Sequence, residues 1–499
     1  MKKIKKLISV LLTCILSFCM INNVHADGVG SIEVNGTTEG KTYEIYKIFD
    51  LTYSGTKVAY TIDSDWEAFF NGEGIEYIVS TNTGNLNQIT IGSEIKYINI
   101  TDDNIEEFTQ KALTYATTLE QNDGSKVAEG ESLTFTDLAL GYYLVYPQGA
   151  TDILDGNGSI CSITSTLPNA TVNIKANYPT IEKEVDDQNA EVGQLIMFTI
   201  TGRVPDTTGY TSYTYQLKDT MSSGLQLDST VADFTIEFID ETTEPDTITK
   251  ITDVIPVYSD NSFILTFDMT NYQDYVGRTI KVTYKVGVTE EAVNSDTTKN
   301  SATLTYSNDP KDLTKTTTTP PVEVFVYSSE INVIKVDAND TEVKLAGASF
   351  VLQNTDGLYY QAVDTNKAVI TNTISTEAIV DVNWVEKEED ATLLVTDENG
   401  IVTFEGIENG TYYLVEVDAP EGYNKLTGPV TVKVGYTDEE ETNLGTVAVS
   451  HEEIVENNSG TELPRTGGIG TKLFIIIGSL LVIGSAVVLI TNKRMSKEY

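Results

Sequence analysis

Residues 410–423 read GTYYLVEVDAPEGY, and the first part of this stretch shows a pattern that recurs along most of the chain. Side chains alternate between the two faces of a β-strand, so Glu416 shares a face with Tyr412 and Leu414. Short alternating runs of this kind, rich in Thr, Val, Ile and Tyr, are separated elsewhere by Gly, Asn and Asp. The pattern predicts an all-β chain built of sandwich modules.

The chain of 499 residues is long enough for several such modules. The expected divisions are a signal peptide at 1–26, three tandem immunoglobulin-like β-sandwich domains at 27–177, 178–328 and 329–458, and a C-terminal tail at 459–499. The first domain is expected to contain one short helix, because residues 103–119 place apolar side chains at helical spacing.

The N-terminus has the composition of a secretory signal peptide. Four lysines lie among the first six residues, an apolar stretch runs from Leu7 to about Ile21, and Val24 and Ala26 form a small-residue cleavage pattern. We expect cleavage after Ala26 and export of the protein.

The C-terminus carries Leu463-Pro464-Arg465-Thr466-Gly467, followed by a charge-free apolar run at 473–490 and a basic tail. The run is about long enough to cross a bilayer, and its basic end is expected to stay in the cytoplasm. This tail resembles the sorting signal of Gram-positive surface proteins, in which a sortase cuts between Thr and Gly and joins the Thr carboxyl to an amine. The resemblance implies a cell-wall-anchored protein that the membrane retains transiently. An ordinary tail-anchored membrane protein is the alternative.

Composition restricts the chemistry that is open to the chain. The formal net charge is −42, with 74 acidic against 32 basic residues, so nucleic acid is not an expected partner. Loss of both ends would leave His451 as the only histidine and Cys161 as the only cysteine. One histidine and one cysteine cannot form a His/Cys zinc site or an internal disulfide. They also offer few ways to build a catalytic nucleophile pair. We expect no metal, no cofactor and no conventional enzyme activity.

The third domain resembles pilin and adhesin domains with a Cna B-type fold. The resemblance rests on the E-box-like residues 410–423, on INVIKVD at 331–337 and on LAGASF at 345–350. In that family a Lys of the opening strand forms an isopeptide bond with an Asn of the last strand, and the E-box Glu promotes the reaction.

This resemblance implies Lys335 as the amine and Glu416 as the promoting acid, with an Asn near the end of the domain as partner. Asn457 shares strand parity with Val455 and is preferred over Asn458. Burial favours a neutral, nucleophilic amine and a protonated carboxyl that can polarise the Asn carbonyl. A core salt bridge that never reacts is the alternative.

The second domain contains another candidate set of a lysine, an asparagine and an acid. Its resemblance to the middle domains of shaft pilins rests on residues 178–185, 215–225 and 299–308. We infer a bond between Lys183 and Asn300 promoted by Asp219, because each of the three shares a strand face with apolar neighbours. Ordinary surface polar residues are the alternative.

The first domain lacks this set. Residues 141–147 align with 411–417, but Tyr146 stands where Glu416 would be, and no Lys occurs between Asp27 and Gly40. We expect no isopeptide bond of this type there. Without a covalent clamp this domain is expected to be the least stable of the three.

Three modules and an LPxTG tail resemble the backbone subunits of sortase-assembled pili. Such a subunit needs a Lys whose amine attacks the Thr acyl-enzyme of the next subunit, usually in a Val-x-Val-Tyr-Pro-Lys strand. Lys175 lies at the corresponding place, but the pair Tyr178-Pro179 follows it instead of preceding it. Lys175 is the expected linking lysine, and other exposed lysines remain candidates. A solvated edge-strand lysine is the alternative interpretation of Lys175.

The expected function is that of a structural pilus subunit, joined by sortase through Thr466 to a lysine of another subunit and stabilised by internal Lys–Asn bonds. Expected partners are sortase, other pilin subunits, peptidoglycan and host surface ligands, and self-crosslinking in a single turnover is its only chemistry. A monomeric wall-anchored adhesin or an ancillary pilin is the first alternative. A secreted glycan-acting enzyme with paired carboxylates is the second. The acidic runs 240–246 and 438–441 are interpreted as solvated loops, with weak calcium binding as the alternative.

Overall fold

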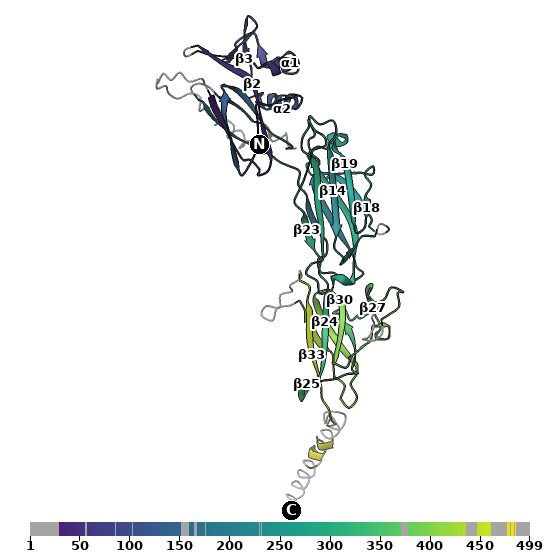
Figure 1. Cartoon of the computed structure of the whole chain (residues 1–499). Coiled ribbons are helices and arrows are strands. Elements are labelled where there is room, and N and C mark those ends of the chain that lie inside the picture. The colour runs from purple at the N-terminus through teal and green to yellow at the C-terminus, as the bar shows by residue number, and fades with distance from the viewer. Residues whose placement is uncertain are drawn as a thin grey trace, which may run out of the picture.

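The protein is represented by a computed structural model. It describes residues 29–460, apart from 55–56, 85, 102, 151–158, 164–166, 175, 229, 231, 371–377 and 436–446, together with 477–479, 481–483 and 485. Three β-rich modules follow one another along an elongated molecule, in chain order (Figure 1).

Each module encloses its own hydrophobic core. The three cores draw their buried residues from 32–174, 181–326 and 331–455. Val192 is the exception, since it precedes the third range in sequence but packs into the third core. The expectation of an all-β chain with three tandem sandwiches is confirmed, and we propose the predicted divisions after 177 and 328 as the domain boundaries.

The first module packs a three-stranded sheet against a larger sheet. The smaller sheet has the order β11-β1-β8, with β1 (Val29–Asn35), β8 (Ser132–Ala139) and β11 (Asn169–Asn173). The larger sheet has the order β10-β9-β2-β3-β5-β6-β4, with β7 beside β2. Its strands are β2 (Thr42–Ser54), β3 (Lys57–Ile62), β4 (Ile78–Val79), β5 (Asn87–Ile91), β6 (Glu94–Ile98), β7 (Gly124–Val127), β9 (Gly141–Pro147) and β10 (Ser159–Ile163).

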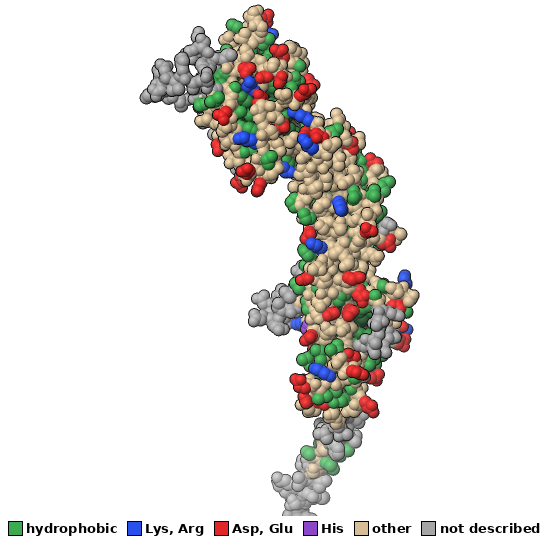
Figure 2. Space-filling model, viewed as in Figure 1, with side chains coloured by type: hydrophobic (Ala, Val, Ile, Leu, Met, Phe, Trp, Pro, Cys, Tyr) green, Lys and Arg blue, Asp and Glu red, His purple; other side chains and the backbone are tan. Residues whose placement is uncertain are grey.

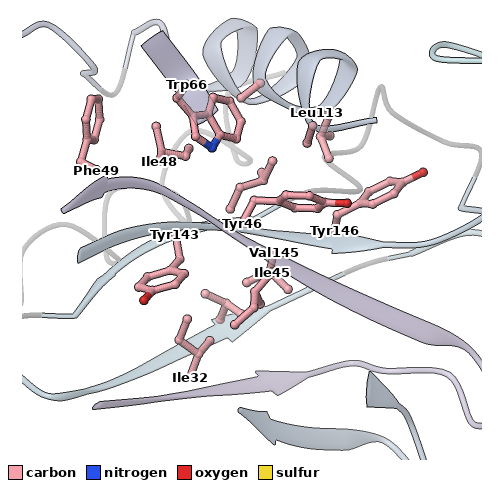
Figure 3. Close-up of a cluster of buried hydrophobic side chains, with 14 of the residues drawn as sticks. Ile32, Ile45, Tyr46, Ile48, Phe49, Trp66, Leu113, Tyr143, Val145 and Tyr146 are labelled. Carbon is pink, nitrogen blue, oxygen red and sulfur yellow. The ribbon is translucent and has the colours of Figure 1, made fainter. Parts of the chain in front are cut away.

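Strands β2 and β9 are covered on both faces (Figure 3). Tyr46 and Tyr146 lie on the same side as Trp66 and the helices, whereas Ile45 and Val145 face the smaller sheet. A strand buried on both faces needs apolar side chains in succession, which explains why this part of the sequence does not alternate. The predicted helix is α2 (Ile105–Ala116), and a second helix that the sequence did not predict, α1 (Glu67–Asn71), lies in the same module.

The second module consists of two packed sheets with the orders β12-β13-β20-β16-β17 and β18-β19-β14-β21-β22. In addition, β15 pairs with β20 and β23 pairs with β21. The strands are β12 (Glu182–Val185), β13 (Leu195–Arg203), β14 (Thr214–Met221), β15 (Leu225–Gln226), β16 (Thr235–Asp240), β17 (Thr247–Lys250), β18 (Val257–Ser259), β19 (Ser262–Asp268), β20 (Thr279–Val288), β21 (Lys299–Ser307), β22 (Thr316–Thr318) and β23 (Val322–Phe325).

The third module is a smaller sandwich with the sheet orders β25-β24-β30 and β28-β27-β26-β31-β32. Here β33 pairs with β24 and β29 pairs with β26. The strands are β24 (Ser329–Asp337), β25 (Asp340–Lys344), β26 (Ser349–Gln353), β27 (Tyr359–Val363), β28 (Asp381–Val385), β29 (Leu394–Val395), β30 (Ile401–Ile407), β31 (Gly410–Asp418), β32 (Val430–Val434) and β33 (Ser450–Asn457).

The beginning and the end of a module lie side by side. In the first module β1 pairs in parallel with β11, and in the third β24 pairs in parallel with β33. In the second module a parallel bridge joins Asn189, just after β12, to Tyr327, just after β23. A covalent bond between the first and the last strands would therefore close a whole module.

Hydrogen bonds connect the first two modules. Lys41 donates to the hydroxyl of Tyr306 (2.7 Å), and Lys311 donates in the opposite direction to the hydroxyl of Tyr46 (2.9 Å). The visible surface of all three modules carries more acidic than basic side chains, in line with the composition (Figure 2).

Candidate functional site

The third module contains a sealed cluster of three polar side chains from three strands. Lys335 comes from β24, Glu416 from β31 and Asn457 from β33, and each side chain is at most 2% exposed. Alternation along each strand puts these groups on the core side, as the sequence predicts. Asn458, the alternative partner, is exposed.

The hydrogen bonds of this cluster converge on the Lys–Asn pair. Lys335 Nζ donates to Asn457 Oδ1 and to the carbonyl of Val455 (3.2 Å). Glu416 Oε1 lies 3.4 Å from Lys335 Nζ and accepts from Asn457 Nδ2 (2.8 Å). The other carboxylate oxygen accepts from the backbone N–H of Leu426 (2.7 Å), which holds the carboxylate in place.

Burial lowers the pKa of Lys335, although the charge of Glu416 opposes the shift. A buried amine that loses its proton more readily is a better nucleophile. The arrangement therefore has the parts needed for amide exchange, namely an amine next to a carboxamide and a carboxylate within reach of both nitrogens.

The second module holds a similar cluster in a different geometry. Lys183 from β12, Asp219 from β14 and Asn300 from β21 are all buried, and Lys183 Nζ donates to Asp219 Oδ2. Because β12 belongs to one sheet and β14 and β21 belong to the other, the cluster lies between the two sheets. Asp219 Oδ1 and Asn300 Oδ1 have no hydrogen-bond partner among the described residues.

Burial acts on both charges of this second cluster. It lowers the pKa of Lys183 and raises the pKa of Asp219, while the attraction between the two groups opposes both shifts. Both directions favour transfer of the proton from the ammonium to the carboxylate, which would leave a neutral amine and a carboxylic acid.

Sequence reasoning missed one member of the second cluster, Tyr284 of β20. Its hydroxyl accepts from Lys183 Nζ (2.5 Å) and from Asn300 Nδ2 (3.0 Å). The signal was available, because Tyr284 is the only side chain with a polar atom on the inward face of β20. The other inward residues of this strand are Ile280, Val282, Val286 and Val288.

The first module has no such cluster in its described part. Tyr146, which aligns with Glu416, is buried opposite Glu44 in the pairing of β2 with β9. No lysine among the described residues of this module is buried. The absence of an isopeptide bond of this type from the first module stays a prediction.

Several predicted features lie outside the described residues. They are the signal peptide at 1–26, Lys175, and Leu463, Pro464, Arg465, Thr466 and Gly467 of the sorting signal. Within the described part of the chain, no helix has the length and apolar character needed to span a membrane, and most of the predicted span at 473–490 falls outside that part.

Two family models match the chain. Residues 329–447 match the SpaA prealbumin-like fold domain, and residues 455–497 match the LPXTG cell wall anchor motif. These matches define the class: a cell-wall-anchored surface protein with a prealbumin-like domain. Anchoring of this kind implies a sortase and peptidoglycan as partners.

Two proteins of known name and one solved structure are similar to the chain. The chain is 24% identical to the trypsin-resistant surface T6 protein of Streptococcus pyogenes serotype M6, over 96% of this chain and 97% of that protein. It is 41% identical over 83 residues to a fimbrial subunit type 1 of Actinomyces viscosus, which covers 17% of this chain and 15% of that protein. The solved structure of the T6 protein, described as a backbone pilin with three domains, is 17% identical with a TM-score of 0.49 and covers 83% of this chain and 81% of that one.

These findings confirm the resemblance to Gram-positive pilins that the sequence showed. The chain carries the prealbumin-like domain and the LPXTG anchor, and it is homologous to the T6 protein along nearly its whole length. The proteins that it resembles are structural proteins rather than enzymes.

Proposed function

We propose that the chain is a shaft subunit of a covalent surface pilus on a Gram-positive bacterium. The observation that carries this function is full-length homology to the T6 pilin, combined with a cell wall anchor at the C-terminus. Its work is structural, because the subunit forms part of a fibre that stands out from the cell wall. Binding of host surface ligands stays a prediction.

We further propose that both buried clusters form intramolecular isopeptide bonds. In the third module the amine is Lys335, the carboxamide is Asn457 and the promoting acid is Glu416. In the second module the corresponding groups are Lys183, Asn300 and Asp219. The support is geometric: each amine is sealed from water with its carboxamide and an acid, and fixed proximity of this kind makes a slow amide exchange feasible.

The linkage between subunits is proposed from the sequence. A sortase would cleave after Thr466 and transfer the threonine carboxyl to a lysine of the next subunit. Lys175 is our candidate for that lysine, because it lies where the first module ends and the second begins.

A wall extract tests the polymer. We expect a ladder of high-mass species that survives boiling in detergent, and we expect Lys175→Arg to reduce it to the monomer, because Arg keeps the charge but offers no nucleophilic amine. The matched control is Lys218→Arg, a change at an exposed lysine of β14.

The outcomes separate the candidate functions. A wild-type extract without a ladder would support the monomeric adhesin or the ancillary pilin. A ladder that persists in Lys175→Arg would keep the pilus and move the linkage to another lysine.

A further inference from the structure

The second cluster contains a group that bridges both reacting nitrogens. The hydroxyl of Tyr284 lies 2.5 Å from Lys183 Nζ and 3.0 Å from Asn300 Nδ2. If the proposed crosslink forms, the first nitrogen becomes part of the new amide and the second leaves as ammonia. Tyr284 therefore contacts the atom that must lose a proton and the atom that must gain one.

In the third module a carboxylate occupies the position between the two nitrogens. There Glu416 Oε1 lies 3.4 Å from Lys335 Nζ and 2.8 Å from Asn457 Nδ2. In the second module Asp219 contacts Lys183 through Oδ2, while its other oxygen has no hydrogen-bond partner among the described residues. Asp219 also interacts with the side chains of Asn300 and Tyr284. The hydroxyl of Tyr284, however, is hydrogen-bonded directly to both nitrogens.

We propose that Tyr284 is a catalytic residue of the second module, a phenol that relays a proton from Lys183 to the leaving nitrogen of Asn300. This inference rests on the proposed self-crosslinking and adds to it a division of labour that the third module lacks. Asp219 takes the first proton and polarises the carbonyl, and Tyr284 carries the second proton.

The steps balance. Lys183 first gives one proton to Asp219, and its neutral Nζ attacks Cγ of Asn300, so that the Nζ–Cγ bond forms while the protonated Asp219 donates to Oδ1. The lone pair of Nδ2 is then no longer delocalised into a carbonyl, because Nδ2 is no longer part of an amide, and Nδ2 can accept a proton. The Tyr284 hydroxyl passes its proton to Nδ2 and receives one from Nζ. The Cγ–Nδ2 bond then breaks and ammonia leaves, while Oδ1 returns its proton to Asp219 as the carbonyl re-forms, so that Asp219 ends with the proton that Lys183 gave up. Tyr284 ends as it began.

Packing holds the phenol in position for this step. Its ring stacks on Phe234 with 5.1 Å between centroids and an interplanar angle of 9°, and the edge of Phe263 meets it at 4.8 Å. Burial and the nearby charge of Asp219 raise the pKa of Tyr284 well above its ordinary value of 10. Tyr284 therefore keeps its proton until a stronger base appears, which suits a relay rather than a permanent phenolate.

The test follows ammonia loss by intact mass in the exported chain, residues 27–462, made by cell-free synthesis. All variants carry Lys335→Ala, so that only the second module can react. We expect Tyr284→Phe to slow the loss by about 100-fold or more, the range typical of a positioned proton-transfer group. The matched control is Tyr215→Phe, because Tyr215 is fully buried in the same module and its hydroxyl has no partner among the described residues.

The outcomes distinguish the relay from the crosslink. Equal rates with and without the Tyr284 hydroxyl would overturn the relay and leave the crosslink standing. No ammonia loss in the Lys335→Ala chain would overturn the crosslink itself, and the relay with it. Equal slowing by Tyr215→Phe would show a general packing effect and overturn the relay.

A second measurement, of the solvent isotope effect, uses a chain that retains Tyr284 and therefore does not depend on whether Tyr284→Phe folds. Two protons move in one step of the relay, so the rate in the Lys335→Ala chain should fall in heavy water and depend quadratically on the deuterium fraction. A rate that is insensitive to deuterium, or that falls linearly, would overturn the relay.

Discussion

At the scale of single residues, we expect one carboxylate to control whether the third module forms its proposed crosslink. Glu416 contacts both nitrogens of the Lys335–Asn457 pair. A glutamine keeps the shape but cannot exchange a proton. The Glu416→Gln chain of residues 27–462 should therefore lack one ammonia mass relative to its own calculated mass, whereas the wild type should lack two. Loss of a crosslink between residues 122 positions apart should also lower the free energy of unfolding of this module by about 5 kcal/mol, on the loop-entropy model of disulfides.

The matched control at this scale is Glu421→Gln, which removes an exposed carboxylate a few residues further along the same stretch. It should change neither the mass deficit nor the stability. A Glu416→Gln chain that still loses two ammonia molecules would refute the assigned role of this carboxylate.

At the scale of elements, we expect the turn between β30 and β31 to make the stability of the third module depend on pH. It packs on the segment that follows β12, where Asn409 N–H donates to Asn189 Oδ1 (3.0 Å). Burial, followed by the charges of Glu191 and Asp187, raises the pKa of Glu408 in this turn from 4.5 to about 7. Between these two values the folded chain binds more protons than the unfolded chain, so this group should make stability fall as pH rises from about 4.5 to about 7.

Calorimetry of Glu408→Gln checks this sign. The variant should match the wild type near pH 4, below both pKa values, and unfold at a higher temperature near pH 8, because its side chain stays neutral. Glu398→Gln, at an exposed site of the same module, is the control. Parallel pH profiles for the wild type and Glu408→Gln would contradict the prediction.

At the scale of the whole molecule, we expect the two proposed crosslinks to determine how tension passes along the chain. The proposed bond in the third module joins its first and last strands. A force applied to the chain ends would therefore pass through this bond, and the residues between Lys335 and Asn457 would not be extended. The bond in the second module bypasses the chain between Lys183 and Asn300. The first module has no comparable cluster among its described residues and should unravel first.

Single-molecule pulling on the ends of residues 27–462 should therefore give one long extension of about 50 nm, at roughly 3.5 Å per residue of the first module. A shorter extension should come from the residues after Asn300. The double variant Lys183→Ala, Lys335→Ala should show two further long extensions. Three long extensions in the wild type would rule out both proposed crosslinks.

Much of this architecture could be predicted from the sequence. Alternation identified the strands, and it correctly placed Lys335, Glu416 and Asn457, as well as Lys183, Asp219 and Asn300, on buried faces. Helix α2 followed from apolar spacing. Helix α1 has only five residues, which is too short for a periodic signal, and the sequence did not predict it.

By itself, the sequence determined the class of the fold, the anchor motif at the C-terminus and the side of each strand on which a polar residue lies, because these properties depend on neighbours in the chain. Only the tertiary structure decided which inward groups meet. Tyr284 reaches Lys183 and Asn300 because β20 and β12 flank β13 in one sheet, while β21 lies in the other. Tertiary packing likewise places Val192 in the core of the following module. Strand parity determines the face of the sheet on which a side chain lies. The order, register and packing of the sheets determine which other side chains it contacts.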